Sequence, residues 1–138
     1  MNEYTFDDIS IGCQADFEVV VTEEMMNSFL DISGDTNPLH TDLNYAKSNG
    51  FDNKVVYGMM EVAFYSRLVG VYLPGKYCIL QSVNASFHYP VFPGDRLFVS
   101  GKVTEKYNAV RSLEISAIIV NQSGKKASKA KIMVGCLR

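Results

Sequence analysis

The chain has 138 residues, of which 47% are hydrophobic and 20% are charged, and its net charge is −2. This composition is typical of a folded globular chain, and we expect one domain spanning residues 1–138. The weak negative charge argues against a nucleic-acid or anionic-membrane partner. There is no signal-peptide pattern and no apolar segment long enough to span a bilayer. The three cysteines are too scattered to form a metal or redox pair, and their odd number suggests reduced thiols in a cytoplasmic protein.

The first half of the chain predicts one strand followed by helices. Residues Cys13 to Val21 alternate and are rich in valine, which favours a strand. Thr22 is a suitable helix N-cap, and the helix that follows it should end at Ser33-Gly34-Asp35. A short helix is expected from Asn44 to Ser48. The segment from Met59 to Tyr72 is apolar on nearly all sides, which predicts a buried helix.

The second half predicts four strands separated by turn residues. Their expected bounds are Tyr77 to Tyr89, Arg96 to Tyr107, Ala109 to Gln122 and Lys126 to Cys136. Long antiparallel strands and one wholly apolar helix suggest a sheet curled around that helix. The predicted fold class is therefore α+β.

The densest group of chemically useful residues runs from Ile32 to His40. Asp35 and His40 lie five residues apart on a segment that its glycine and proline should keep rigid and non-helical. A carboxylate and an imidazole that share one water molecule can activate the water and manage its proton. The alternative from spacing alone is that Asp35 caps a turn and that His40 is an ordinary loop histidine.

A second candidate feature precedes the apolar helix. The first amides of a helix lack intrahelical partners and lie at the positive end of its dipole. Gly58 has no side chain, so a substrate carbonyl could approach its N–H, as in an oxyanion hole. The alternative is that Gly58 only lets the chain turn before the helix.

Taken together, these segments resemble the MaoC-like dehydratases, the family of R-specific enoyl-CoA hydratases. The hydratase signature of that family is matched by Ser33, Gly34, Asp35, Asn37, Pro38, Leu39, His40 and Ala46. The second block of the family, Val-His-Gly-Met, corresponds to Val56-Tyr57-Gly58-Met59. A later trait matches Phe87, Pro90-Val91 and Gly94-Asp95, so the resemblance covers nearly the whole chain.

The resemblance implies a hotdog fold, in which a curved antiparallel sheet wraps one long helix. It also implies a role for individual residues. Asp35 and His40 match the catalytic pair that holds and activates the water, and Asn37 matches the residue that orients this pair. Gly58 matches the glycine whose N–H binds the thioester oxygen. Ser66 falls where some members have a serine that supports the active site.

One departure from the family concerns the shape of the pocket. Tyr57 stands where the family usually has histidine, and tyrosine is bulkier and neutral at pH 7. The backbone N–H of Gly58 does not depend on that side chain, so we expect the oxyanion site to be preserved. We expect Tyr57 and Met59 to contact the substrate. Glu61 is unusual on so apolar a helix, and we expect it to be exposed at an edge or paired.

The activity implied by the resemblance is reversible hydration of trans-2-enoyl thioesters to R-3-hydroxyacyl thioesters. The acyl carrier would be coenzyme A or an acyl carrier protein, with no metal or redox cofactor, and the chain would form at least a homodimer. Two alternatives stay open. One is a hotdog thioesterase, and the other is a non-catalytic acyl-binding subunit; Tyr57 is the best support for the second. The lysines of the last hairpin form a solvated face, or attract the phosphates of the carrier: Lys125, Lys126, Lys129 and Lys131.

Overall fold

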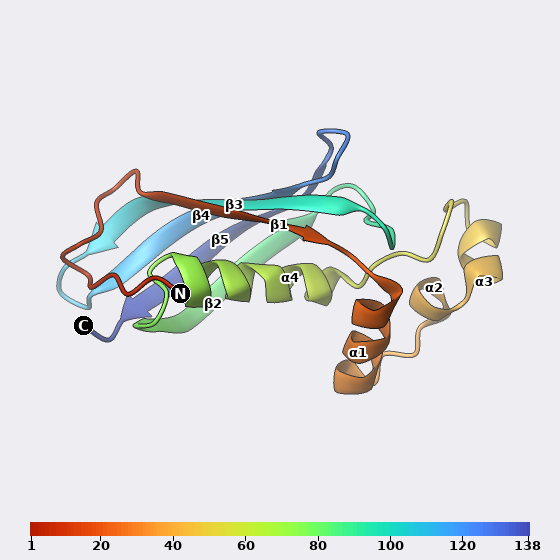
Figure 1. Ribbon diagram of the computed structural model, residues 1–138, viewed down its shortest axis with the longest axis horizontal. Coiled ribbons are helices and arrows are strands. Elements are labelled where there is room, and N and C mark those ends of the chain that lie inside the picture. The colour runs from red at the N-terminus through yellow and green to blue at the C-terminus, as the bar shows by residue number, and fades with distance from the viewer.

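A single antiparallel sheet forms the larger part of the molecule in the computed structural model, which describes residues 1–138 (Figure 1). Its five strands lie in the order β1-β3-β4-β5-β2, so β1 and β2 are the free edges. The strands are β1 (Gln14–Val20), β2 (Cys78–Phe87), β3 (Arg96–Tyr107), β4 (Ser112–Val120) and β5 (Lys126–Cys136).

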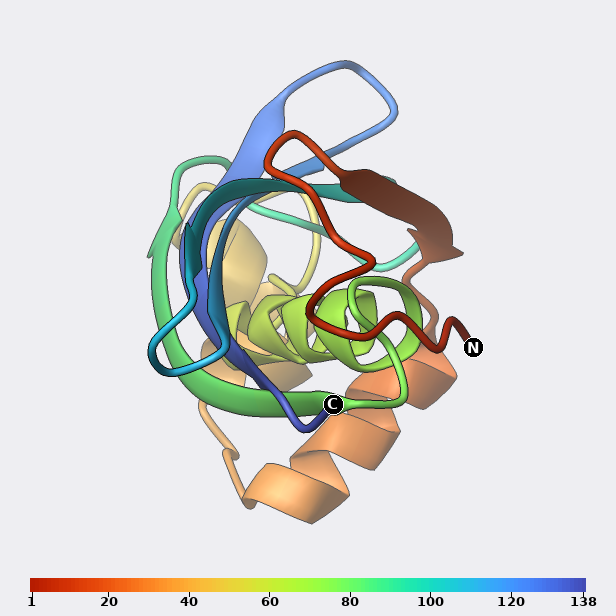
Figure 2. The ribbon, with the colours of Figure 1, turned by 90° about the vertical axis from the view of Figure 1, so that its left-hand side faces the viewer.

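The helix α4 (Gly58–Arg67) lies in the hollow of the curved sheet, as the end-on view in Figure 2 shows. Tyr65 of this helix is fully buried, and its hydroxyl donates to Ser128 Oγ on β5 at 2.9 Å. Gly101 on β3 allows close packing, because a Cβ there would lie 2.7 Å from Leu68 Cδ2. The predicted arrangement, a curved antiparallel sheet around one apolar helix, is confirmed.

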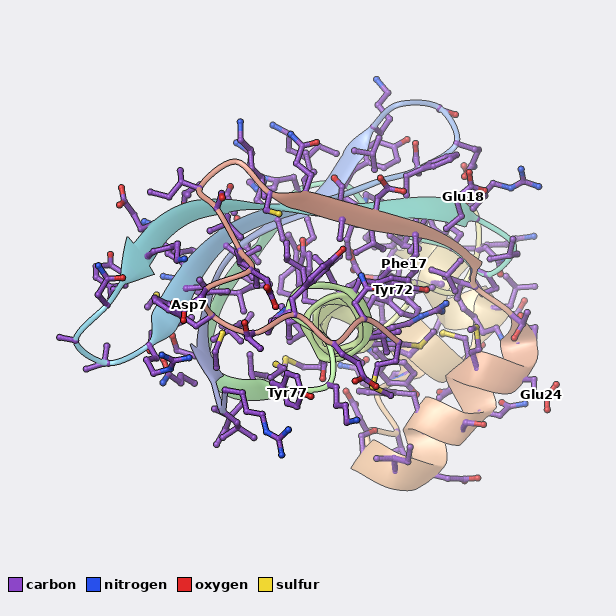
Figure 3. All side chains as sticks on the ribbon, turned by 60° about the vertical axis from the view of Figure 1, so that its left-hand side comes forward. Asp7, Phe17, Glu18, Glu24, Tyr72 and Tyr77 are labelled. Atoms are coloured by element: carbon purple, nitrogen blue, oxygen red, sulfur yellow. The ribbon has the colours of Figure 1, made fainter.

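The final turn of the central helix is wider than an α-helical turn. A π-helical segment, η1 (Leu68–Tyr72), continues α4, and the N–H of Leu73 donates to the carbonyl of Leu68 five residues earlier. Tyr72 lies beside Phe17 of β1 (Figure 3), and the two rings stack with their centroids 5.4 Å apart. Arg67 lies over the same Phe17 ring at 4.2 Å. These contacts join the end of the helix to the edge strand β1.

The predicted bounds hold for β3 and β5, but the strand expected from Ala109 begins later. β4 starts at Ser112 because the turn after β3 extends through Arg111, which has a positive φ of 49°. β2 ends at Phe87, which leaves His88 just beyond the strand rather than within it.

Three short helices form a separate group at the N-terminal end of α4 (Figure 1): α1 (Glu23–Ser33), α2 (Pro38–Thr41) and α3 (Leu43–Ser48). Thr22 caps α1 as predicted, since its side chain accepts the N–H of Met25 at 3.1 Å. The prediction that the segment up to His40 is non-helical is wrong from Pro38 onward. Proline occupies the first position of α2, where its missing N–H costs nothing and its fixed φ suits a helix.

Candidate active site

A cavity of about 250 Å³ lies where these short helices meet the start of α4. It brings together residues that are far apart in the sequence. Five of the predicted site residues line it, namely Asp35, His40, Tyr57, Gly58 and Met59. The remaining wall is made of Phe29, Ser33 and Phe87.

Hydrogen bonds from backbone N–H groups to side-chain oxygens fix the loop that carries Asp35. Asp35 Oδ1 accepts the N–H of Asn37 at 3.1 Å, while the N–H of Asp35 donates to Ser33 Oγ at 3.1 Å. Asn37 Oδ1 in turn accepts the N–H of Leu39 at 2.9 Å and so caps α2. Asn37 therefore links the carboxylate to the helix that carries His40, although its side chain does not line the cavity. This leaves Asp35 Oδ2 without a hydrogen-bond partner in the chain.

The orientation of the His40 ring follows from one short hydrogen bond. Nδ1 lies 2.6 Å from the carbonyl oxygen of Val55. A carbonyl oxygen only accepts, so Nδ1 must carry the proton. In the neutral imidazole, Nε2 then has a free lone pair. His40 is consequently held as the tautomer that can accept a proton from a water in the cavity.

Tyr57 contacts both Asp35 and His40. The residue is only 2% exposed, and its hydroxyl donates to the backbone carbonyl of Asp35 at 3.0 Å. Its ring stacks on His40 with centroids 4.1 Å apart, and it contacts the Phe29 ring in a tilted arrangement with centroids 4.8 Å apart. Burial, and then the negative charge of Asp35, raise the pKa of Tyr57, so the hydroxyl remains a donor. The tyrosine is a buried contact of both predicted catalytic groups.

The first turn of α4 presents free amides to the same cavity. The N–H groups of Met60 and Glu61 donate to the carbonyl of Tyr57, whereas those of Gly58 and Met59 have no acceptor in the chain. They lie at the positive end of the helix, where a developing negative charge is stabilised. Gly58 lies close to Phe87, since a Cβ there would lie 3.2 Å from the ring and the ring would have to shift to accept a larger residue.

Two predicted positions behave differently from expectation. Ser66 is exposed in the last turn of α4, eight residues beyond Gly58, which corresponds to roughly 12 Å along the helix. It lines no part of the cavity, and its supporting role stays a prediction. Glu61 was expected to be exposed or paired, and both expectations are wrong. It is buried, and its Oε1 has no hydrogen-bond partner.

Sequence reasoning missed the Val55 carbonyl, which sets the tautomer of His40. A backbone carbonyl carries no signal in the sequence, so only the folded structure could reveal it. No group of three or more His, Cys, Asp and Glu side chains is placed to hold a metal ion. None of the helices has the length and apolar character needed to cross a bilayer.

The chain is similar to known proteins over most of its length. The family model described as MaoC like domain matches residues 9–123. The chain belongs to the MaoC-like domain family. The (R)-specific enoyl-CoA hydratase of Rhodospirillum rubrum is 33% identical to this MaoC-like chain over 105 residues, which are 73% of each protein. The hydratase of the same name from Aeromonas caviae is 33% identical over 107 residues, covering 78% of this chain and 80% of that protein.

A solved structure extends the similarity to the fold. The (R)-hydratase from Aeromonas caviae superposes on this MaoC-like chain with a TM-score of 0.89 at 29% identity. The match covers 93% of this chain and 97% of the hydratase. The hotdog fold expected from the sequence is confirmed. The catalytic roles of Asp35, His40 and Gly58 stay predictions, since only their arrangement has been observed.

Proposed function

We propose that this chain catalyses the reversible hydration of trans-2-enoyl thioesters to R-3-hydroxyacyl thioesters. The observation that carries the proposal is the hydrogen bond from His40 Nδ1 to the Val55 carbonyl. It leaves Nε2 as a base in the cavity that also contains Asp35 and the free amide of Gly58. A base, a carboxylate that holds the water and an oxyanion donor around one cavity are the groups that addition of water to an enoyl thioester requires.

The reaction follows from this arrangement. The thioester carbonyl accepts the N–H of Gly58, and a water lies between His40 Nε2 and Asp35 Oδ2. His40 takes a proton as the water oxygen bonds to C3, and the π electrons of the double bond move toward the thioester oxygen. The resulting enolate is stabilised by the Gly58 amide and the helix dipole. The protonated His40 then gives its proton to C2, which completes the hydration and restores the free Nε2 lone pair; dehydration follows the same steps in reverse.

The relatives support both the reaction and its stereochemistry, because two of them are named as (R)-specific enoyl-CoA hydratases. The acyl carrier is coenzyme A or an acyl carrier protein. Hydration adds one water without changing the overall oxidation level, so the proposal needs no redox cofactor. We also propose a cytoplasmic location, which imaging of the tagged chain in its own cell would test.

Crotonyl-CoA provides a direct test. Incubation with the wild-type protein should remove the ultraviolet absorbance of the conjugated double bond, and chiral analysis should identify R-3-hydroxybutyryl-CoA. Asp35→Asn, which keeps the size of the side chain, is the matched inactive control. Butyryl-CoA in a parallel reaction tests the thioesterase alternative, because it has no double bond to hydrate. Release of free coenzyme A from butyryl-CoA with no loss of crotonyl absorbance would overturn the proposal.

We further propose that the chain acts as a homodimer. The sheet has two free edges, and β2 exposes Ile79, Leu80 and Phe87. Asp35 is itself exposed in the single chain, so a second copy would shield the cavity from bulk water. Light scattering at micromolar concentration should give twice the chain mass of 15.4 kDa. A monomeric mass would contradict this proposal.

A further inference from the structure

A second cavity, of about 280 Å³, adjoins the candidate active site. His40, Gly58 and Phe87 line both cavities, so the two spaces meet at the predicted oxyanion site. Most of the second wall is apolar and includes Phe51, Val56, Pro90 and Val91. An apolar space that opens beside the thioester position is suited to the acyl chain of the substrate.

The polar side chains of this wall are His40, His88, Tyr89 and Glu61, and Glu61 is the only one of them that is buried. It is the only carboxylate that lines the second cavity, and only 4% of the residue is exposed. Its Oε1 is the only buried side-chain nitrogen or oxygen atom in the chain without a hydrogen-bond partner. An unsatisfied buried polar atom is costly, and in native proteins it calls for a specific explanation. The missing partner is explained if a bound molecule supplies it.

The position of Glu61 indicates which part of the substrate it would meet. Glu61 lies three residues after Gly58, which is about 4.5 Å along the helix and on a neighbouring part of the same face. A thioester held at the Gly58 amide would therefore place its reacting carbons at His40. The carbons beyond the double bond would then extend past Glu61.

The charge state of Glu61 limits the kind of substrate group that it can bind. Burial raises its pKa to about 8, so the group is mostly a neutral carboxylic acid at pH 7. A neutral acid donates one hydrogen bond and accepts others, which matches a hydroxyl or carbonyl oxygen. An acyl chain with a cationic group would instead bring an ion into a mostly apolar space, at a high desolvation cost.

We propose that the second cavity takes the acyl chain and that Glu61 hydrogen-bonds a neutral oxygen-bearing group on it. The protein would thereby favour enoyl thioesters that carry a hydroxyl or carbonyl group beyond the double bond over enoyl thioesters with a plain alkyl chain. This inference rests on the proposed hydratase function and specifies its substrate class. Glu61 would select the substrate, whereas Asp35 and His40 would act at the reacting carbons.

The test compares 6-hydroxy-trans-2-hexenoyl-CoA with trans-2-hexenoyl-CoA, which differ only in a terminal hydroxyl. The wild-type protein should have a kcat/KM for the hydroxylated substrate roughly fivefold to tenfold higher, the ratio expected for one net neutral hydrogen bond. Glu61→Leu, which removes the polar group at similar volume, should abolish or invert the preference. Glu61→Gln, which still donates and accepts, should retain it.

The result that would overturn the inference is a wild-type protein without preference, or a leucine variant with the wild-type preference. A wild-type protein that hydrates neither compound would instead contradict the proposed function. In that case the dissociation constants of 6-hydroxyhexanoyl-CoA and hexanoyl-CoA, measured by calorimetry, decide the role of Glu61 without turnover. The same fivefold to tenfold preference in binding would support it, and equal affinities would overturn it.

Discussion

The buried carboxyl group of Glu61 makes the stability of the protein depend on pH in a defined direction. Its pKa is raised from 4.5 to about 8 by burial, so the folded state holds a proton that the unfolded chain releases. Below about pH 4.5 both states are protonated and the group costs nothing through ionisation. As pH rises from 4.5 to about 8, the free energy of unfolding decreases progressively, because the unfolded state loses its proton first. Above that range the free energy of unfolding decreases no further on account of this group.

The size of the effect follows from the two pKa values. Each pKa unit corresponds to about 1.4 kcal/mol, so the full difference approaches about 5 kcal/mol. Roughly 3 kcal/mol of this loss is already present at pH 7. Glu61→Gln has nearly the same shape and does not ionise. The free energy of unfolding of this variant relative to wild type should therefore increase with pH over the same range.

Urea unfolding of both proteins at about pH 5, 7 and 9 measures this difference. The comparison depends on the change with pH, because glutamine adds a constant offset of its own. Glu105→Gln removes an exposed carboxylate and controls for the general effect of losing one negative charge. If the difference between Glu61→Gln and wild type stayed constant across the three pH values, the carboxyl group would not be desolvated as described.

Further substitutions test the site and the packing separately. Asp35→Asn and His40→Ala should each lower kcat for crotonyl-CoA by roughly a hundredfold to ten-thousandfold while leaving the circular dichroism spectrum unchanged. The double variant should be little worse than either single one, because both groups act on the same water, and multiplied losses would refute a shared role. Tyr57→His should change turnover by less than about tenfold, since the Gly58 amide is a backbone donor; activity that appears only in this variant would show that the wild type is a binding protein. Gly101→Ala should lower the free energy of unfolding by roughly 1 to 3 kcal/mol in urea titrations, because its Cβ would meet Leu68 at 2.7 Å, and an unchanged value would show that the helix moves away freely.

The strands could be predicted from sequence wherever their two faces have different surroundings. In β3, Leu97, Val99, Gly101 and Val103 are buried while residues between them are more exposed. Turn residues at both ends of this segment set its predicted bounds, which match the structure. The start of β4 could not be placed in this way. Residues 109–111 continue the turn after β3, and the positive φ of Arg111 has no residue signature comparable to glycine.

The candidate site was only partly visible in the sequence. The motif from Gly34 to His40 predicted that Asp35 and His40 lie in one site, and both line the same cavity. It could not show that the Val55 carbonyl orients His40, since that contact joins backbone and side chain across 15 positions. It also could not show that Glu61 is buried without a partner. That property depends on how β2 and the loop after it pack against α4.

The group of short helices has few anchors to the rest of the molecule. Between Glu23 and Val55, only Met26 and Ala46 are buried, and Figure 1 shows these helices projecting beyond the end of the sheet. Segments with so little buried apolar surface open locally at a smaller free energy than global unfolding requires. Backbone amides of α2 and α3 should therefore exchange with deuterium sooner than those of β3 and β4. A ligand bridging Asp35 and Gly58 would slow that exchange, so deuterium uptake could report occupancy even for compounds that are not turned over.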